Sequence, residues 1–373
     1  MADYTEAFVG IDTSKLRNAV AVAESGRKGE VRYLGEIDNT PDATRKLVAK
    51  LSKRYGKLHF CYEAGPTGYS LHRQLVELGH DNIVVAPSLI PKRPGDRVKT
   101  NRLDAESLAK LLRAGELTAV WVPDEAHEAI RDLVRARDAA VKDQRAKRQQ
   151  LTSFLLRRGI SYPGKTAWTK THDRWLAGLK FEHHAQRLVL EESLSAIHDA
   201  SARIARIEKA IAELSPQWSL TPVVEAIRAM RGFDFIAAVS IVSEVGDFSR
   251  FTKPSQLMGF LGLTPSESST GDSVKRGPIT KAGNSRARRI VVESAWAYRF
   301  PARLGADKRE RLEAQPKAVG QIAWKAQTRL CARYRALIAK GKKPAVAVTA
   351  IARELVGFVW AIACETPLAK AAG

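Results

Sequence analysis

The sequence has 373 residues, more than one hydrophobic core usually supports, so two or three domains are expected. Hydrophobic residues make up 45% of the chain and charged residues 27%, a balance that excludes a disordered protein. The 61 Lys and Arg residues exceed the 40 Asp and Glu residues and give a formal net charge of +21, which favours a polyanionic partner over a purely metabolic role.

Residues 1–122 alternate between strand-like and helix-like patterns. Strands are predicted at 8–12, 19–22 and 31–34, where apolar runs are separated by turn-forming residues. The predicted elements that follow are a helix at 41–55, a strand at 58–63, a helix at 70–78, a strand at 83–86 and a helix at 104–113. Three strands followed by alternating helix and strand predict an α/β domain of the RNase H-like type.

Residues 123–215 predict a helical arm, because neither 124–158 nor 179–215 contains Gly or Pro. Apolar residues in alternating three- and four-residue steps, with Ser201 at the one polar position, form a predicted coiled-coil seam of Leu190, Leu194, Ile197, Ile204, Ile207, Ile211 and Leu214. The pattern indicates a helical hairpin or a dimerisation arm. Two ordinary helices on the core of the same chain would show the same periodicity. Nine basic residues against three acidic ones in 131–158 make Arg145 and Arg148 candidate nucleic-acid contacts.

Residues 216–373 predict a basic, mainly helical domain that begins at Pro216 and Pro222. Its segment 273–343 contains 19 basic and four acidic residues, whereas residues 1–120 contain 19 basic and 15 acidic ones. A composition that is merely basic would spread its charge evenly. This concentration therefore predicts a nucleic-acid surface in the C-terminal part.

The cysteines and the apolar runs bear on the cellular compartment. Cys61, Cys331 and Cys364 are far apart and show no CxxC spacing, so neither a disulfide framework nor a zinc site is expected. No apolar run approaches the length of a membrane span, and Asp3 and Glu6 stand where a signal peptide would be basic. We expect a cytoplasmic protein without a membrane partner.

Two carboxylates end predicted strands of the first domain. Asp12 ends one apolar strand and Glu63 ends another, and in an RNase H-like sheet these strands are neighbours. Two such carboxylates repel each other unless they are protonated or bridged by a cation, and Mg²⁺ prefers carboxylate oxygens. The pair suggests metal-assisted phosphodiester cleavage.

A third group of candidate ligands opens the helix predicted after residue 99. Asn101 and Asp104 are three residues apart and share one helical face, a spacing that suits two oxygens on the same ion. The simpler interpretation is an Asn cap followed by an acidic first turn, which stabilises helices in general. The carboxylates at 12 and 63 favour the metal interpretation.

These motifs resemble the transposases of the IS110 family of insertion sequences. The resemblance covers nearly the whole chain through segments 10–15, 63–68, 99–105 and 262–265, followed by Gly277, Ile279, Lys281 and Gly283. It implies a RuvC-like domain with a DEDD acidic tetrad, a C-terminal domain with a nucleophilic serine, guidance by a structured non-coding bridge RNA, and action as a multimer. It also implies a location in the bacterial cytoplasm, at the nucleoid.

By position, the tetrad is Asp12, Glu63, Asn101 and Asp104, with Mg²⁺ or Mn²⁺ as the implied cofactor. Asn at the third position departs from the family pattern, since an amide oxygen can ligate Mg²⁺ but brings no negative charge. Either Asn101 still ligates, Glu106 compensates from further round the helix, or this copy is weakened.

The implied nucleophile lies in segment 265–271, where the residue before Gly271 is Thr270 instead of the family serine. The methyl group of Thr crowds in-line attack at phosphorus, so the neighbouring Ser269 is narrowly preferred. A Ser-rich turn without a function is the alternative when the segment is taken alone. Polar and basic residues around the next helix start are candidate phosphate contacts: Lys275, Arg276, Lys281, Asn284, Arg286, Arg288 and Arg289.

The expected activity is therefore DNA transposition. Metal-bound carboxylates and the hydroxyl of Ser269 or Thr270 cut and rejoin donor and target DNA through a covalent intermediate, in a dimer or tetramer guided by RNA. Two alternatives stay open: a RuvC-like structure-specific endonuclease that uses only the acidic site, and a catalytically decayed nucleic-acid-binding protein.

Overall fold

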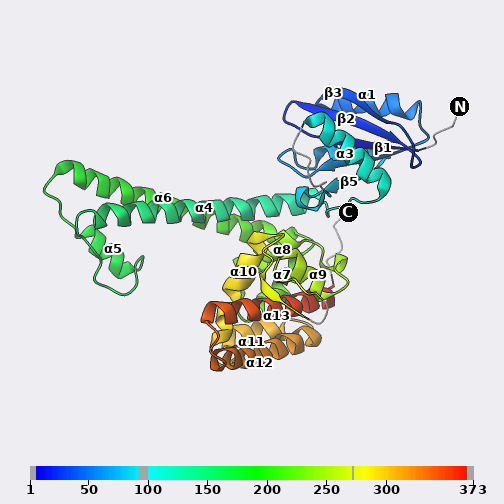
Figure 1. The fold of residues 1–373 in the computed structure, drawn as a ribbon. Helices are drawn as coiled ribbons and strands as arrows, with labels where there is room; N and C mark the ends of the chain where they lie inside the picture. Colours follow the sequence, from blue (N-terminus) through cyan, green and yellow to red (C-terminus); the bar gives the residue numbers. More distant parts are fainter. Residues whose placement is uncertain (1–5, 92–99, 271–272, 368–373) are drawn as a thin grey trace. The chain divides into compact units, whose positions relative to one another are not determined.

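The computed structural model describes residues 6–91, 100–270 and 273–367. The chain divides into two compact units, Met1–Val122 and Pro123–Gly373 (Figure 1). The first unit is a mixed α/β domain and the second is mainly helical.

The first unit is built on a five-stranded sheet in the order β3-β2-β1-β4-β5. The strands are β1 (Glu6–Asp12), β2 (Arg17–Glu24), β3 (Val31–Asp38), β4 (Lys57–Glu63) and β5 (Asp81–Val85). The first three strands pair antiparallel, whereas β4 pairs parallel to both β1 and β5. The predicted strands and their alternation with helices after β3 are confirmed, with most strands longer by a few residues than their apolar runs indicated.

Helices cover both faces of this sheet. Side chains alternate between the two faces of a strand, so Val20 and Val22 pack with the helix α1 (Pro41–Ser52), while Ala19 and Ala21 pack with α3 (Asn101–Ala114) on the opposite face. A third helix, α2 (Ser70–Glu77), connects β4 to β5. Burial on both faces explains why β1 and β2 are almost continuously apolar.

The second unit begins with a helical hairpin of α4 (Glu125–Leu156) and α6 (His184–Leu214), joined through the short helix α5 (Lys170–Ala177) (Figure 1). Leu190 and Ile197 of the predicted seam are buried against Leu151 and Phe154 of α4. The polar seam position is also matched, because Gln144 Nε2 donates to Ser201 Oγ at 2.7 Å. The apolar face of α6 is therefore directed at α4 of the same chain.

The rest of the second unit is a helical domain with one small hairpin. Its elements are α7 (Thr221–Arg228), α8 (Phe235–Val245), α9 (Pro254–Phe260), β6 (Pro265–Glu267), β7 (Arg276–Ile279), α10 (Ser285–Ala295), α11 (Ala306–Glu313), α12 (Lys317–Ala339) and α13 (Pro344–Glu365). One core joins α8, α10, α12 and α13, with Val242, Val291, Leu330 and Leu355 fully buried. The expectation of a mainly helical C-terminal part is confirmed.

The sequence expectation that no apolar run reaches the length of a membrane span is wrong for α13. This helix is long and apolar enough to cross a membrane by length and composition, and it is the only described helix that is. Ile351, Leu355 and Val359 are nevertheless buried in the protein core. Glu354 Oε2 accepts a hydrogen bond from Arg329 Nε of α12 at 2.9 Å. A buried core helix passes the same length test, so α13 is weak evidence for a membrane span.

Candidate functional site

Asp12 and Glu63 end two neighbouring parallel strands. Ile11 of β1 is paired with Tyr62 of β4, and Asp12 and Glu63 are the next residues along these strands. The loops that follow are also joined, since Thr13 Oγ1 lies 3.2 Å from Thr67 Oγ1. Both carboxylates therefore lie at the carboxyl ends of the central strands, where open α/β sheets generally carry their sites.

The start of α3 faces the same edge of the sheet. Near the other end of this helix, Arg113 donates to the carbonyl of Glu24 at 3.1 Å, and Glu24 is paired with Ala7 at the beginning of β1. Because α3 thus runs antiparallel to β1, its first turn, with Asn101 and Asp104, lies toward the Asp12 end.

Asn101 is not the cap of α3. Thr100 occupies that position, and its side chain accepts a hydrogen bond from the backbone N–H of Leu103 at 3.2 Å. Asn101 is the first helical residue instead, so capping does not account for its side chain. Glu106 is engaged elsewhere, by Arg102 Nε at 2.8 Å and Lys110 Nζ at 3.9 Å, which weakens the idea that it replaces the missing carboxylate.

The donor chemistry of Asp12, Glu63, Asn101 and Asp104 fits a hard divalent cation, since all four supply oxygen. Within residues 6–91, 100–270 and 273–367, however, no group of three or more His, Cys, Asp or Glu side chains lies close enough together to hold a metal ion. The structure places the four residues at one edge without gathering three carboxylates, so a metal site there stays a prediction.

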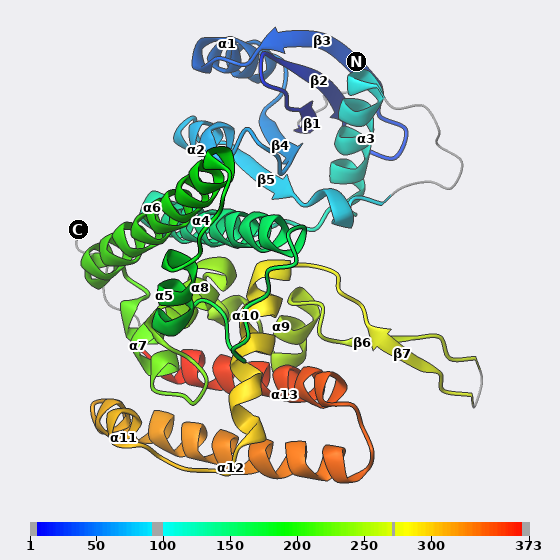
Figure 2. The ribbon, with the colours of Figure 1, turned by 90° about the vertical axis from the view of Figure 1, so that its left-hand side faces the viewer.

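The second candidate group lies on the β6–β7 hairpin, which projects from the helices of the second unit (Figure 2). Ser269 and Thr270 are exposed beyond the end of β6. Ser269 Oγ donates to Glu267 Oε1 at 2.9 Å, whereas Thr270 exchanges main-chain hydrogen bonds with Ser273. Gly271, which follows Thr270, and Lys99 of the third motif lie outside the described residues.

The candidate phosphate contacts divide into exposed and engaged groups. Lys275 and Lys281 are exposed, and Lys281 has a positive φ of 55°, unusual for a residue other than glycine. Arg276 contacts Glu267 Oε2 through Nε at 3.4 Å. On the arm, Arg145 is exposed and Arg148 stacks over the Trp168 ring, 4.9 Å from its centroid.

The four candidates on α10 all have protein partners. Asn284 caps the helix through Ala287 N at 3.0 Å, and Arg288 donates to the carbonyl of Leu261 at 2.8 Å. Arg286 and Arg289 both approach Asp138 of α4, Arg286 at 3.6 Å. These residues hold α10 against its neighbours, and a DNA phosphate would have to compete with Asp138 for the two arginines.

Sequence reasoning missed a buried acid, Glu244. Its side chain is 1% exposed and receives a bidentate ion pair from Arg135 at 2.8 and 2.9 Å. Asn284 Nδ2 donates to it as well, at 2.8 Å. Burial, the largest influence, acts to raise the pKa of Glu244, but the hydrogen bonds from Arg135 and Asn284 outweigh it, and the pKa is lowered. One signal was visible: Glu244 is the sole charged residue of the apolar segment 235–245.

Glu244 lines a charged cavity of about 420 Å³ between α4, α6, α8 and α10. Its walls include Arg135, Asp138, Arg286 and Arg289, so the cavity contains the same ion pairs that hold these helices together.

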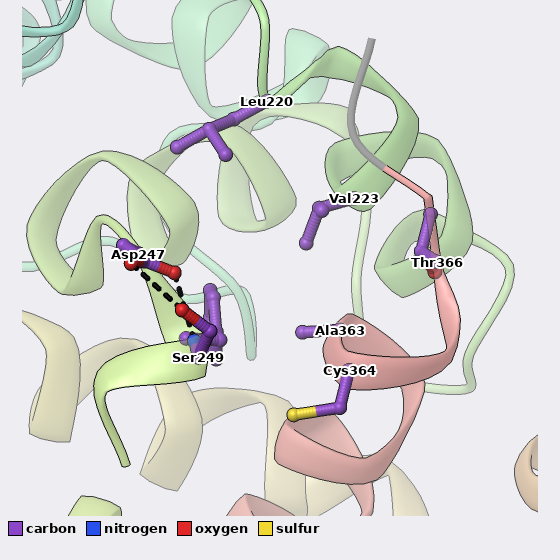
Figure 3. A pocket seen from close by; sticks show the side chains of 8 residues that line it. Leu220, Val223, Asp247, Ser249, Ala363, Cys364 and Thr366 are labelled. Atoms are coloured by element: carbon purple, nitrogen blue, oxygen red, sulfur yellow. Dashed lines mark hydrogen bonds between the residues drawn. The ribbon is translucent and has the colours of Figure 1, made fainter.

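A smaller cavity of about 130 Å³ lies near the end of α13 (Figure 3). There the backbone N–H of Ser249 donates to Asp247 Oδ1 at 2.8 Å and so caps a short helical turn, and no candidate site residue lines the cavity.

Comparison with known proteins gives two matches to transposase families. Residues 9–158 match a transposase profile of the DEDD type named for IS110, and residues 224–307 match the profile described as "Transposase IS116/IS110/IS902 family". The chain is 58% identical over 365 residues to the transposase-like protein y4qE of Sinorhizobium fredii, covering 98% of this chain and 90% of that protein. It is 33% identical over 343 residues to the transposase for insertion sequence element IS1533 of Leptospira borgpetersenii, covering 90% and 98%.

The first matched region contains the strand-end carboxylates and the start of α3, and the second contains the β6–β7 hairpin. Together these matches define the class of the protein, a DNA transposase encoded by an insertion sequence. The chain belongs to the IS116/IS110/IS902 family of transposases.

Proposed function

We propose that this transposase cuts and rejoins DNA with two groups of residues: the carboxylates at the edge of the first unit's sheet and a hydroxyl on the β6–β7 hairpin. The observation that carries the proposal is the placement of Asp12 and Glu63 at adjacent strand ends, with the first turn of α3 directed to the same edge. Ser269 is the proposed nucleophile and Thr270 the alternative.

An RNase H-like, RuvC-like fold for the first unit is part of this proposal. Three antiparallel strands followed by two parallel ones, in the order β3-β2-β1-β4-β5, support it. So does the location of the two strand-end acids on β1 and β4, the strands at which antiparallel and parallel pairing meet.

Asp12, Glu63, Asp104 and the amide oxygen of Asn101 would hold Mg²⁺ or Mn²⁺. The ion would stabilise negative charge on the scissile phosphate. Three carboxylates and one amide carry one negative charge fewer than four carboxylates. This chain is therefore proposed to bind the ion more weakly than a chain with Asp at position 101.

The hydroxyl of Ser269 is proposed to form a bond to phosphorus and so link the protein covalently to one DNA strand. Such a bond conserves the energy of the phosphodiester, and rejoining then needs no ATP. The exposed position of Ser269 on a projecting hairpin supports access by DNA.

DNA, as donor and target, and a structured non-coding RNA are the proposed partners, and the chain is proposed to act as a dimer or tetramer in the bacterial cytoplasm. The net charge of +21 and its concentration in residues 273–343 support a polyanionic partner. Sequencing the nucleic acid that co-purifies with the native protein tests the guide: one discrete short RNA encoded beside the gene supports it, and random fragments contradict it.

Trapping the covalent intermediate tests the proposed function. Full-length protein, together with the nucleic acid that co-purifies with it, is incubated with Mg²⁺ and labelled DNA that carries the ends of its element, and the reaction is stopped with detergent. We expect a protease-sensitive protein–DNA species that disappears when Ser269→Ala and Thr270→Ala are combined and persists in the neighbouring Ser268→Ala control. Cleavage without any adduct would support the endonuclease, and salt-sensitive binding without cleavage would support a decayed protein.

A further inference from the structure

Glu267 bridges the two sides of the β6–β7 hairpin next to the proposed nucleophile. Its Oε1 accepts the hydrogen bond from Ser269 Oγ at 2.9 Å, and its Oε2 lies 3.4 Å from Arg276 Nε. Glu267 and Arg276 are register partners across the two strands, so the hairpin itself sets their pairing. Each carboxylate oxygen thus has its own partner, a hydroxyl on one side and a guanidinium on the other.

We propose that Glu267 is a catalytic residue, the general base that takes the proton of Ser269, and that Arg276 is the positioning residue that orients it. This proposal rests on the assignment of Ser269 as nucleophile. A weakly acidic hydroxyl needs a proton acceptor within hydrogen-bond reach, about 2.6–3.2 Å, and Glu267 meets that distance. A carboxylate is one of the side-chain groups that act as general bases.

The proton and electron movements balance without a further reactant besides water. As Ser269 Oγ forms its bond to phosphorus, its proton passes to Glu267 Oε1. The bond between phosphorus and one bridging deoxyribose oxygen breaks, and that oxygen leaves with its electron pair and takes a proton from water. In rejoining, an attacking DNA hydroxyl forms the bond to phosphorus and gives its proton to the hydroxide left in solvent by the first step. The bond between phosphorus and Ser269 Oγ breaks, and Glu267 returns its proton to the serine oxygen.

The same contacts distinguish Ser269 from Thr270. The hydrogen bonds of Thr270 to Ser273 are made by its main chain, whereas the side chain of Ser269 is aligned with a carboxylate. The hairpin therefore prepares the serine for proton loss, and a base at Glu267 accounts for a serine nucleophile even though threonine occupies the position before Gly271.

Arg276 has a role that a simple phosphate contact would not predict. A guanidinium has five N–H donors, so the contact through Nε leaves others for DNA. Both side chains are well exposed, at 68% for Arg276 and 48% for Glu267, and an exposed pair adds little to stability. We expect the pair to orient Glu267 and so to affect the rate of adduct formation.

The test is the rate of adduct formation in a single turnover of the full-length protein between pH 6 and pH 9, with its co-purifying nucleic acid and DNA that carries the ends of the element. Glu267→Gln keeps an oxygen acceptor of the same shape but cannot take a proton. We expect its rate to fall about 100-fold at pH 7 and to rise about tenfold per pH unit, because the serine proton must then leave to solvent. The wild-type rate should be nearly constant over this range.

Three further measurements interpret the result. Glu310→Gln, an exposed change on α11, is the matched control and should keep the wild-type rate. DNA affinity measured by fluorescence anisotropy should be equal for wild type and Glu267→Gln, which separates chemistry from binding. Arg276→Lys should lose less rate than Arg276→Ala, since Lys can still contact the carboxylate.

The outcomes separate this proposal from the proposed function. Loss of the adduct in Ser269→Ala together with a wild-type rate and pH profile in Glu267→Gln would overturn the general-base assignment and leave the nucleophile intact. Persistence of the adduct in Ser269→Ala would overturn the general base and the choice of Ser269. Persistence in the combined Ser269→Ala and Thr270→Ala variant would overturn the proposed function as well. A slow, pH-dependent Glu267→Gln with unchanged DNA affinity supports the general base.

Discussion

Gly10 of β1 lies directly under the backbone of Ala105 in α3. A Cβ atom at Gly10 would lie 2.4 Å from the Ala105 carbonyl oxygen and 2.5 Å from Ala109 N, closer than real Cβ atoms come to such atoms. The absence of a side chain at this one strand position lets α3 rest on the sheet. The contact therefore sets how near the first turn of α3, with Asn101 and Asp104, comes to Asp12.

Gly10→Ala tests this relationship. The added methyl group has to push α3 away, so we expect a loss of about 1–3 kcal/mol in the free energy of unfolding, measured by urea denaturation. Adduct formation should fall further than the loss of folded protein explains. Gly320→Ala on α12, where an added Cβ meets nothing within 4 Å, is the control and should be neutral or slightly stabilising. Equal stability of Gly10→Ala and wild type would show that α3 does not rest on β1.

Removal of the buried acid should unfold the second unit more readily. Glu244→Ala removes the buried carboxylate that Arg135 and Asn284 contact, and breaking a buried pair in this way costs about 3–5 kcal/mol. Chemical denaturation followed by circular dichroism measures the loss. A change below about 1 kcal/mol would contradict the central role of this network.

The same carboxylate predicts an acid limit of stability. The pKa of Glu244 in the folded protein is lower than its ordinary value of 4.5, with burial opposed and outweighed by Arg135 and Asn284. Its contribution to stability is therefore fully present above about pH 4.5 and is lost as the pH falls through the folded-state pKa. Melting temperatures between pH 6 and pH 3 should fall more steeply for wild type than for Glu244→Gln; parallel curves would exclude Glu244 as the titrating group.

Asp138 should restrain DNA binding by the two arginines of α10. Asp138→Asn removes the carboxylate with which a phosphate must compete for Arg286 and Arg289. We expect DNA affinity to rise about fivefold, and the slope of log affinity against log salt to steepen by about 1 to 2. Asp143→Asn, which affects only the Lys147 pair on the same helix, is the control. Unchanged affinity and slope would assign these arginines to the fold alone.

Asn101→Asp restores the fourth carboxylate of the proposed metal site. The added charge should tighten Mn²⁺ binding about tenfold, measured by electron paramagnetic resonance without DNA, and should lower the Mg²⁺ concentration needed for half-maximal adduct formation. Asp12→Asn should have the opposite effect on binding. If neither substitution changes Mn²⁺ affinity, the metal is held elsewhere.

The elements of the first unit could be predicted because its strands are apolar runs of regular period, ended by Asp12 and Glu63 and separated by clear turns. The long helices of the arm were equally visible as stretches without Gly or Pro. Their partner was not, because the seam from Leu190 to Leu214 fits a second chain as well as it fits α4. The β6–β7 hairpin is not predictable in the same way, since the four residues of β7, three of them exposed and two of them Gly and Pro, resemble a loop.

Side-chain pairing lay beyond the sequence for a different reason. Asp138 and Arg289 are 151 positions apart, and Glu244 and Arg135 are 109 apart, so no local pattern joins them. The sequence alone therefore predicts the arginines of α10 as phosphate contacts and does not show that Arg286 and Arg289 approach Asp138. The length of α13 is hard to see in the sequence because Arg353 and Glu354 interrupt its apolar residues. In the structure Glu354 pairs with Arg329 of α12.

The most direct test of the whole account is to identify the residue that carries DNA. The trapped adduct is digested with protease and nuclease, and the peptide that retains a nucleotide is sequenced by mass spectrometry. The account predicts the phosphate on the side-chain oxygen of Ser269. A nucleotide on a residue outside the β6–β7 hairpin, or efficient cleavage with no modified peptide, would contradict it.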